Sequence, residues 1–136
     1  VRDEGTSRTY IDSIYPAIPD FELMNACVEA AEEEQIPAHV GMARSHDSFY
    51  TDREDEIDAL WACRGVLGCD METAALFVIG RLRGVKTASV LNTVVEYEDN
   101  LEDNINNYTD GVNATVQGEK NEIHVALEAL YRCSGK

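Results

Sequence analysis

Positive charge is scarce in this sequence. Its 11 Lys and Arg residues stand against 26 Asp and Glu residues, which gives a formal net charge of −15 at pH 7. A surface of that sign repels phosphate backbones, so nucleic acid is not expected as a partner. The sequence also has no signal-like start and no apolar run of the ~20 residues that a membrane helix needs. We therefore expect no membrane partner and a cytoplasmic location.

Metal-binding patterns are missing too. The cysteines form no Cys-x-x-Cys pair, and no histidine lies at zinc-finger spacing from them. The four thiols are expected to be reduced and buried; they are Cys27, Cys63, Cys69 and Cys133. The acidic segment 96–104 lacks the ligand pattern of a calcium-binding loop and is interpreted as a solvated surface loop. No metal site is predicted.

The sequence has no internal repeat and no low-complexity linker, and its composition is that of a globular protein. With 136 residues, 44% of them hydrophobic and 27% charged, it is long enough for one domain with a buried core. The sequence therefore predicts a single globular domain over residues 1–136.

Helical and strand-like patterns alternate along the chain. The spacing of apolar residues predicts helices over 20–36, 57–64, 71–83 and 116–131. Short apolar runs predict strands over 38–45, 66–70 and 85–95, the first and last of them buried. Asp20 is expected to cap the first helix and Pro37 to end it, and Gly65 and Gly84 are expected to end the next two.

Strands that alternate with helices are typical of an α/β fold with parallel pairing. We therefore predict a three-layer α/β architecture, with a parallel or mixed sheet flanked by helices. Ligands of such sheets bind beyond the carboxyl ends of the strands. Three candidate sites follow: the loop after residue 45, the stretch 70–72 and the segment after Asn92.

Two acids interrupt the apolar stretch "GVLGCDMETAALFVIG", where a strand gives way to a helix. One interpretation is that Asp70 and Glu72 cap the helix and complement its dipole. The other is that they accept hydrogen bonds from paired hydroxyl groups, such as those of a ribose, while Met71 forms an apolar wall for the sugar. Residue position alone leaves both interpretations open.

The sequence "GVLGCDMETAAL" resembles the ribose-binding signature of the nucleoside phosphorylase-I family, Glu-Met-Glu followed by small residues. Upstream, "VRDEGTSRTY" is similar to the Gly-Ala-Ser segment of uridine phosphorylases. The stretch "AIPDFELMNACVEAAEEEQIPAHVGMARSHDSFYTD" is similar to the helix, strand and base-pocket loop that follow it in that family. The resemblance extends over residues 1–95, in several ordered blocks, and implies a phosphorylase/hydrolase-like fold.

The resemblance implies a role for each matched residue around the sugar. Glu72 matches the acid that holds the ribose hydroxyls, and Met71 matches the methionine that packs against the sugar. Asp70 stands where the family usually has Glu, with a side chain one methylene shorter, and is also expected to bind substrate. Phe49 matches the aromatic residue beside the base, and the neighbouring Tyr50 is expected to face the protein.

Around the base the sequence departs from the family pattern. Uridine phosphorylases follow Phe-Tyr with a Gln and an Arg, whereas this chain has Arg53 near the first position and Asp55 near the second. Arg53 can donate to a carbonyl oxygen of the base and help it to leave. Purine enzymes have an Asp after the strand that ends here at Asn92, where this chain has "TVV" with Val94 and Val95. That apolar pair favours a pyrimidine, while the short spacing between Phe49 and residue 70 resembles the purine branch.

The resemblance implies a pentosyltransferase that converts a nucleoside and inorganic phosphate to a base and ribose 1-phosphate, with no cofactor beyond phosphate as co-substrate. The catalytic residues would be Glu72 and Arg53. A purine nucleoside phosphorylase or nucleosidase of the same fold is the alternative, and a non-catalytic nucleoside-binding or assembly fragment is a third. The sequence has no Gly-rich phosphate loop, so we interpret it as the C-terminal half of such a domain, weak or inactive alone. By resemblance we expect a homo-oligomer, either a dimer or a hexamer built from dimers.

Overall fold

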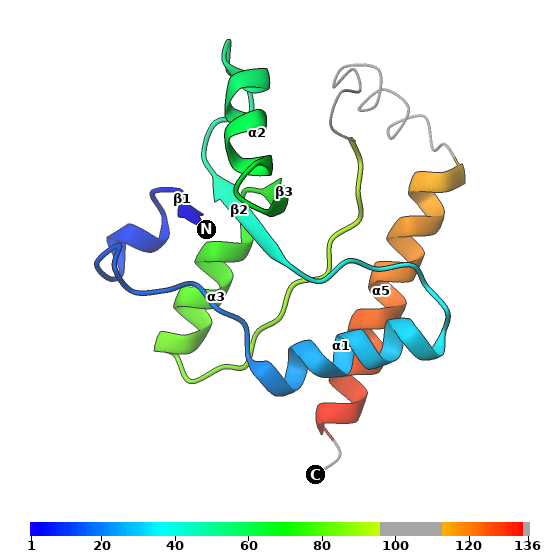
Figure 1. The fold of residues 1–136 in the computed structure, drawn as a ribbon. Coiled ribbons are helices and arrows are strands. Elements are labelled where there is room, and N and C mark those ends of the chain that lie inside the picture. Colours follow the sequence, from blue (N-terminus) through cyan, green and yellow to red (C-terminus); the bar gives the residue numbers. More distant parts are fainter. Residues whose placement is uncertain (96–112, 135–136) are drawn as a thin grey trace. The chain divides into compact units, whose positions relative to one another are not determined.

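The computed structural model describes residues 1–95 and 113–134 (Figure 1). The elements in these residues are β1 (Arg2–Asp3), η1 (Ser7–Thr9), α1 (Phe21–Glu33), β2 (Met42–His46), α2 (Glu54–Ala62), β3 (Val66–Asp70), α3 (Thr73–Leu82) and α5 (Asn113–Ser134). The predicted helices and the strands at 38–45 and 66–70 are confirmed, with shifted ends. The acidic segment 96–104 lies outside the described residues.

The chain divides into two compact units. Unit 1 consists of Val1–Met24 and Ala38–Ser89, and it holds the sheet with α2 and α3. Unit 2 consists of Asn25–Pro37 and Val90–Lys136, and it holds most of α1 together with α5.

The sheet of unit 1 is parallel, with the strand order β1-β2-β3. Ser45 pairs with Arg2 on one side and with Asp70 on the other, so the carboxyl ends of the strands lie at one edge. Successive residues of a strand face opposite sides of the sheet. Arg44 lies over the Trp61 ring of α2, at 5.5 Å from its centroid, whereas Ser45 accepts a hydrogen bond from α3. Helices α2 and α3 therefore contact opposite faces of β2, and the predicted α/β arrangement of a parallel sheet flanked by helices is confirmed.

Local sequence signals mark the starts and ends of the helices as predicted. The Asp20 carboxylate accepts the Leu23 N–H at 3.1 Å and so caps α1. Gly65 and Gly84 follow α2 and α3 with φ of +79° and +70°, the left-handed conformation that glycine adopts without strain. Pro37 follows the turn that ends α1, where the Ile36 N–H bonds back to the Ala31 carbonyl.

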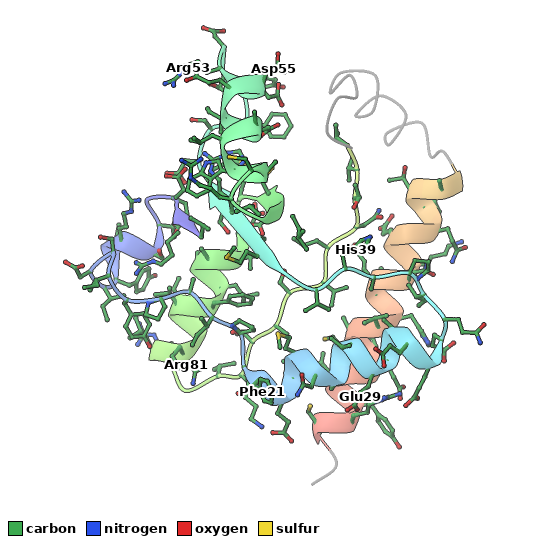
Figure 2. All side chains as sticks on the ribbon, viewed as in Figure 1. Phe21, Glu29, His39, Arg53, Asp55 and Arg81 are labelled. Carbon is green, nitrogen blue, oxygen red and sulfur yellow. The ribbon has the colours of Figure 1, made fainter. Side chains whose placement is uncertain are left out.

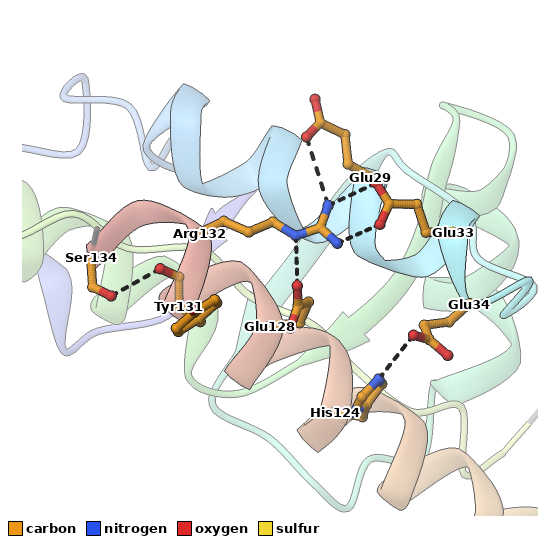
Figure 3. A network of polar contacts seen from close by, with 8 residues as sticks. All are labelled: Glu29, Glu33, Glu34, His124, Glu128, Tyr131, Arg132 and Ser134. Atoms are coloured by element: carbon orange, nitrogen blue, oxygen red, sulfur yellow. Dashed lines mark hydrogen bonds and ion pairs between the residues drawn. The ribbon is translucent and has the colours of Figure 1, made fainter. Parts of the chain in front are cut away.

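The core of unit 2 is built from small side chains where α1 meets α5. Ala30, Ala31 and Val125 are buried together, and Cys27 and Val90 pack against them. The acids of α1 lie on its solvent-exposed side, as expected, and two of them form ion pairs with α5. Figure 3 shows this network: Arg132 pairs with Glu33 at 2.7 Å, Glu128 at 3.0 Å and Glu29 at 3.9 Å, and His124 lies 3.6 Å from Glu34.

The prediction of a buried strand over 85–95 is wrong. No residue of this segment is assigned to a strand or is fully buried. Its backbone groups bond elsewhere: the Val85 N–H donates to the Gly80 carbonyl of α3, and the Thr87 carbonyl accepts the Asp20 N–H ahead of α1. An apolar run is not a strand unless a neighbouring strand pairs with it.

Two predictions of burial are also wrong. The segment 38–45 forms β2 only from Met42 onward, and Val40 and Met42 are exposed. The four cysteines are free, as predicted, but none is buried, and Cys63 and Cys69 are exposed. Apolar character in the sequence indicates a preference for burial, but burial also needs a covering element. No helix in the described residues is long and apolar enough to cross a membrane.

Candidate functional site

The carboxyl edge of the sheet in unit 1 brings together the segments that follow the three strands. Asp47, just after β2, accepts the N–H of Gly5, just after β1, at 2.8 Å. Ser45, near the end of β2, donates its hydroxyl to Asp70, the last residue of β3, at 2.6 Å. These bonds link the loops at the edge where parallel sheets bind their ligands.

Asp70 is held firmly at this edge. Its Oδ1 accepts the Ser45 hydroxyl and, at 3.0 Å each, the backbone N–H groups of Glu72 and Thr73. Burial by itself would raise the pKa of Asp70, but the hydrogen bonds from Ser45, Thr73 and Glu72 outweigh it and keep the pKa below its ordinary value. The helix-capping interpretation is therefore correct for Asp70. Its role as a substrate ligand stays a prediction.

Glu72 is exposed directly before α3, next to Asp70 but with different contacts. Its carboxylate accepts the Met71 N–H at 3.1 Å, and no basic side chain pairs with it in the described part of the chain. An exposed carboxylate without a cation partner is free to accept hydrogen bonds from a ligand. The two acids thus have separate surroundings: one is enclosed by donors of the protein, and the other faces solvent.

The loop after β2 carries the aromatic pair. The rings of Phe49 and Tyr50 meet edge to face, with centroids 5.0 Å apart. Tyr50 is 86% exposed and Phe49 47% exposed, so the expectation that Tyr50 faces the protein is wrong. Strand-like alternation does not apply here because the residues after His46 form an irregular loop.

Arg53 and Asp55 lie at the amino-terminal end of α2 (Figure 2). The Arg53 guanidinium forms two hydrogen bonds of 2.9 Å with Glu56 in the same helical turn and is largely exposed. Hydrogen bonding to Glu56 raises the pKa of Arg53 above its ordinary value. Val94 and Val95 belong to unit 2, where both are half-buried. The functional roles of Arg53, Val94 and Val95 stay predictions.

Sequence reasoning missed Ser45 and Glu4. Ser45 is 2% exposed and connects Asp70 to α3, because its Oγ also accepts the Ala74 N–H at 2.8 Å. Glu4 is buried just after β1, where its Oε2 accepts the Ser7 N–H at 2.8 Å. A polar residue at the end of an apolar strand was the available signal for Ser45. No signal in the sequence distinguishes Glu4 from the many exposed acids.

The hydrogen bonds of Asp70 predict a particular pH dependence of stability. Because the pKa of Asp70 is lowered in the folded protein, its ionised form stabilises the fold above the unfolded pKa of about 3.9. That contribution is lost as the pH falls through the lower folded pKa. The difference in the free energy of unfolding between the wild type and Asp70→Asn should therefore shrink between about pH 6 and pH 3. Urea unfolding across this range measures it, and a difference that stays constant or grows toward low pH would contradict the assignment.

Comparison with known proteins identifies a family that the chain matches. Residues 1–130 match the family described as the phosphorylase superfamily. A uridine phosphorylase from Treponema pallidum is 33% identical over 144 residues, covering 96% of this chain and 52% of that protein. A DeoD-type purine nucleoside phosphorylase from Bacillus subtilis is 40% identical over 90 residues, covering 65% of this chain and 38% of that protein.

Comparison with solved structures agrees with these sequence matches. The crystal structure of uridine phosphorylase from Vibrio fischeri superposes with a TM-score of 0.84 at 44% identity, covering 96% of this chain and 52% of that one. The chain thus spans about half the length of this structure and of the Treponema pallidum relative, and it contains part of their fold. The match over residues 1–130 is most of the sequence, and we conclude that this chain belongs to the phosphorylase superfamily.

Proposed function

We propose that this chain supplies the ribose-binding part of a nucleoside phosphorylase of the uridine phosphorylase kind. The reaction is the phosphorolysis of a nucleoside, in which phosphate displaces the base from C1′ of the sugar to give ribose 1-phosphate. The observation that carries the proposal is the exposed carboxylate of Glu72, which has no cation partner in the described residues and lies next to the carboxyl edge of a parallel sheet.

In this proposal Glu72 accepts hydrogen bonds from the neighbouring ribose hydroxyls. A charged acceptor strengthens such bonds relative to a neutral one, and holding the sugar orients C1′ toward the incoming phosphate. The transition state resembles an oxocarbenium ion, so a nearby negative charge also stabilises the developing positive charge. Met71 and Phe49 are assigned the apolar contacts to the sugar and the base.

Arg53 is assigned to the departing base. Its guanidinium can donate to a carbonyl oxygen of a pyrimidine, where negative charge develops as the glycosidic bond breaks. To do so it has to leave its two bonds to Glu56, which lie on the exposed surface of α2 and are therefore weak. The apolar pair Val94 and Val95, at the sequence position where purine enzymes of the family have an Asp, favours a pyrimidine over a purine.

Phosphate has to be held by residues outside this assignment. The sequence has no Gly-rich phosphate loop, and the chain spans about half of the uridine phosphorylases it resembles. We therefore propose that further polypeptide completes the phosphate site, in a cytoplasmic homo-oligomer that needs no cofactor. A purine nucleoside is the second candidate substrate, because a DeoD-type purine nucleoside phosphorylase is 40% identical over 90 residues.

Base release in the protein as its gene encodes it tests this function. Uridine, inosine and methylthioadenosine are each supplied with and without inorganic phosphate, and the free base and ribose 1-phosphate are quantified. We expect uracil release from uridine that requires phosphate and yields ribose 1-phosphate in equal amount. Release that ignores phosphate would point to hydrolysis and contradict a phosphorylase, and preference for inosine would reassign the base.

A further inference from the structure

Two side chains at the ends of neighbouring strands fix the start of α3. The Ser45 hydroxyl donates to Asp70 Oδ1 at 2.6 Å, and Ser45 Oγ in turn accepts the Ala74 N–H at 2.8 Å. Asp70 Oδ1 also accepts the N–H groups of Glu72 and Thr73, both at 3.0 Å. Three consecutive backbone donors, those of residues 72 to 74, are thus bound by one serine and one carboxylate.

Two neighbouring strands hold the turn that carries Glu72. Ser45 belongs to β2 and Asp70 to β3, and the two are register partners in the sheet. A further contact supports the same turn, because Thr73 Oγ1 and Ser89 Oγ lie 2.9 Å apart. The backbone of Glu72 is therefore attached to the sheet, while its side chain is exposed. Ser45 is 2% exposed and cannot itself touch a ligand in solution.

We propose that Ser45 and Asp70 form a positioning pair that holds Glu72 in place to bind the ribose, and that Asp70 acts through this role rather than as a ligand of the sugar. The inference rests on the proposed function of Glu72. Asp70 Oδ1 is occupied by three donors of the protein, and Oδ2 is buried with no hydrogen-bond partner in the described residues. Neither oxygen faces solvent in the way the Glu72 carboxylate does.

The shorter side chain at position 70 suits this role. An aspartate carboxylate reaches the N–H groups two and three residues further along the chain, as in Asx turns and helix caps. The bonds to Glu72 and Thr73 have this spacing. Aspartate in place of the family's first glutamate therefore fits the two backbone hydrogen bonds that this turn forms.

The test measures kcat and KM for uridine and for 2′-deoxyuridine in the protein as its gene encodes it. We expect Ser45→Ala and Asp70→Ala each to lower kcat/KM for uridine by about 10-fold, because small displacements of a binding group are costly. The double variant should be little worse than either single one, since the pair acts as a unit. Asp70→Asn keeps the acceptor oxygen and should recover most of the loss seen with Asp70→Ala. Ser13→Ala, an exposed serine remote from the turn in sequence, is the control.

The ratio of kcat/KM between uridine and 2′-deoxyuridine separates positioning from direct binding. If Asp70 contacts the 2′ hydroxyl, Asp70→Asn should reduce this ratio; positioning predicts that the ratio is unchanged within about twofold, since no bond to the sugar is removed. A reduced ratio in Asp70→Asn would overturn the proposal, as would a Ser45→Ala variant with wild-type kinetics. Circular dichroism and thermal melts check that each variant is folded, and if Asp70→Ala is not, Ser45→Ala and Asp70→Asn decide the question.

Glu72→Ala in the same assays distinguishes a failure of the proposed function from a failure of the positioning pair. An active wild type with an inactive Glu72→Ala and an unaffected Ser45→Ala would leave the proposed function intact and remove only the positioning pair. A fully active Glu72→Ala would remove the proposed function, and the positioning pair with it.

Discussion

Replacing Glu72 by Gln or Ala is expected to lower kcat/KM for uridine by at least about 100-fold. Hydrogen bonds to a charged group contribute about 1.5–3 kcal/mol each, and a single carboxylate that holds two ribose hydroxyls makes two of them. A loss of about 2.7 kcal/mol already corresponds to a factor of 100. Glu72→Gln keeps the shape of the side chain, so its effect isolates the charge. Steady-state kinetics and calorimetric titration with uridine measure the loss.

Glu32→Gln provides the matched control for this result. Glu32 is an exposed glutamate on the wet side of α1, and the same loss of charge there should leave kinetics and affinity unchanged. Unfolding of Glu72→Gln should also stay close to wild type, since the Glu72 side chain makes a single local hydrogen bond in the described structure. Unchanged affinity for uridine in Glu72→Ala would contradict its role as the ribose acceptor.

Val78→Ala is expected to have the largest effect on stability, a decrease of about 2 kcal/mol in the free energy of unfolding. Val78 lies in α3 with 0% of its surface exposed. The substitution removes two buried methyl groups and leaves a cavity that the surrounding side chains fill only in part. Urea unfolding followed by far-ultraviolet circular dichroism measures the change.

Leu76→Ala in the same helix is the control for Val78→Ala. Leu76 is 46% exposed, so its truncation removes less buried surface and leaves no closed cavity. The expected change is well below that of Val78→Ala, although leucine is the larger side chain. Equal losses in the two variants would contradict the complete burial of the Val78 side chain.

Helix boundaries were predictable because their signals are local. The capping carboxylate of Asp20 and the left-handed glycines Gly65 and Gly84 act within a few residues of their own position. The parallel sheet was predictable for a similar reason, since strands linked by helical crossovers pair in parallel. These features depend on the chain order and on short-range chemistry.

Features that depend on distant partners were not predictable in this way. The segment 85–95 is as apolar as a strand, but its backbone bonds to α3 and to Asp20 instead of to a sheet. Val40 and Met42 are apolar yet exposed. Spacing and hydropathy describe what a residue favours, whereas pairing and burial depend on what the fold places beside it.

The candidate site was likewise predictable where its signals are local and not where it depends on distant partners. The two acids at 70 and 72 could be located from the sequence, but their separate roles follow from Ser45, which is 25 residues away from Asp70 and forms a hydrogen bond with it. Neither spacing nor composition connects those two positions. The capping and binding interpretations were left open by the sequence, and the hydrogen bonds assign capping to Asp70.

The position of the ribose is best tested by a crystal structure of the protein, as its gene encodes it, with uridine bound. We predict that the 2′ and 3′ hydroxyl oxygens of the ribose lie within hydrogen-bond distance, about 2.5–3.0 Å, of the Glu72 carboxylate. Asp70 should keep its bonds to Ser45 and to the start of α3. A ribose bound elsewhere, with Glu72 still facing solvent, would contradict the role proposed for Glu72.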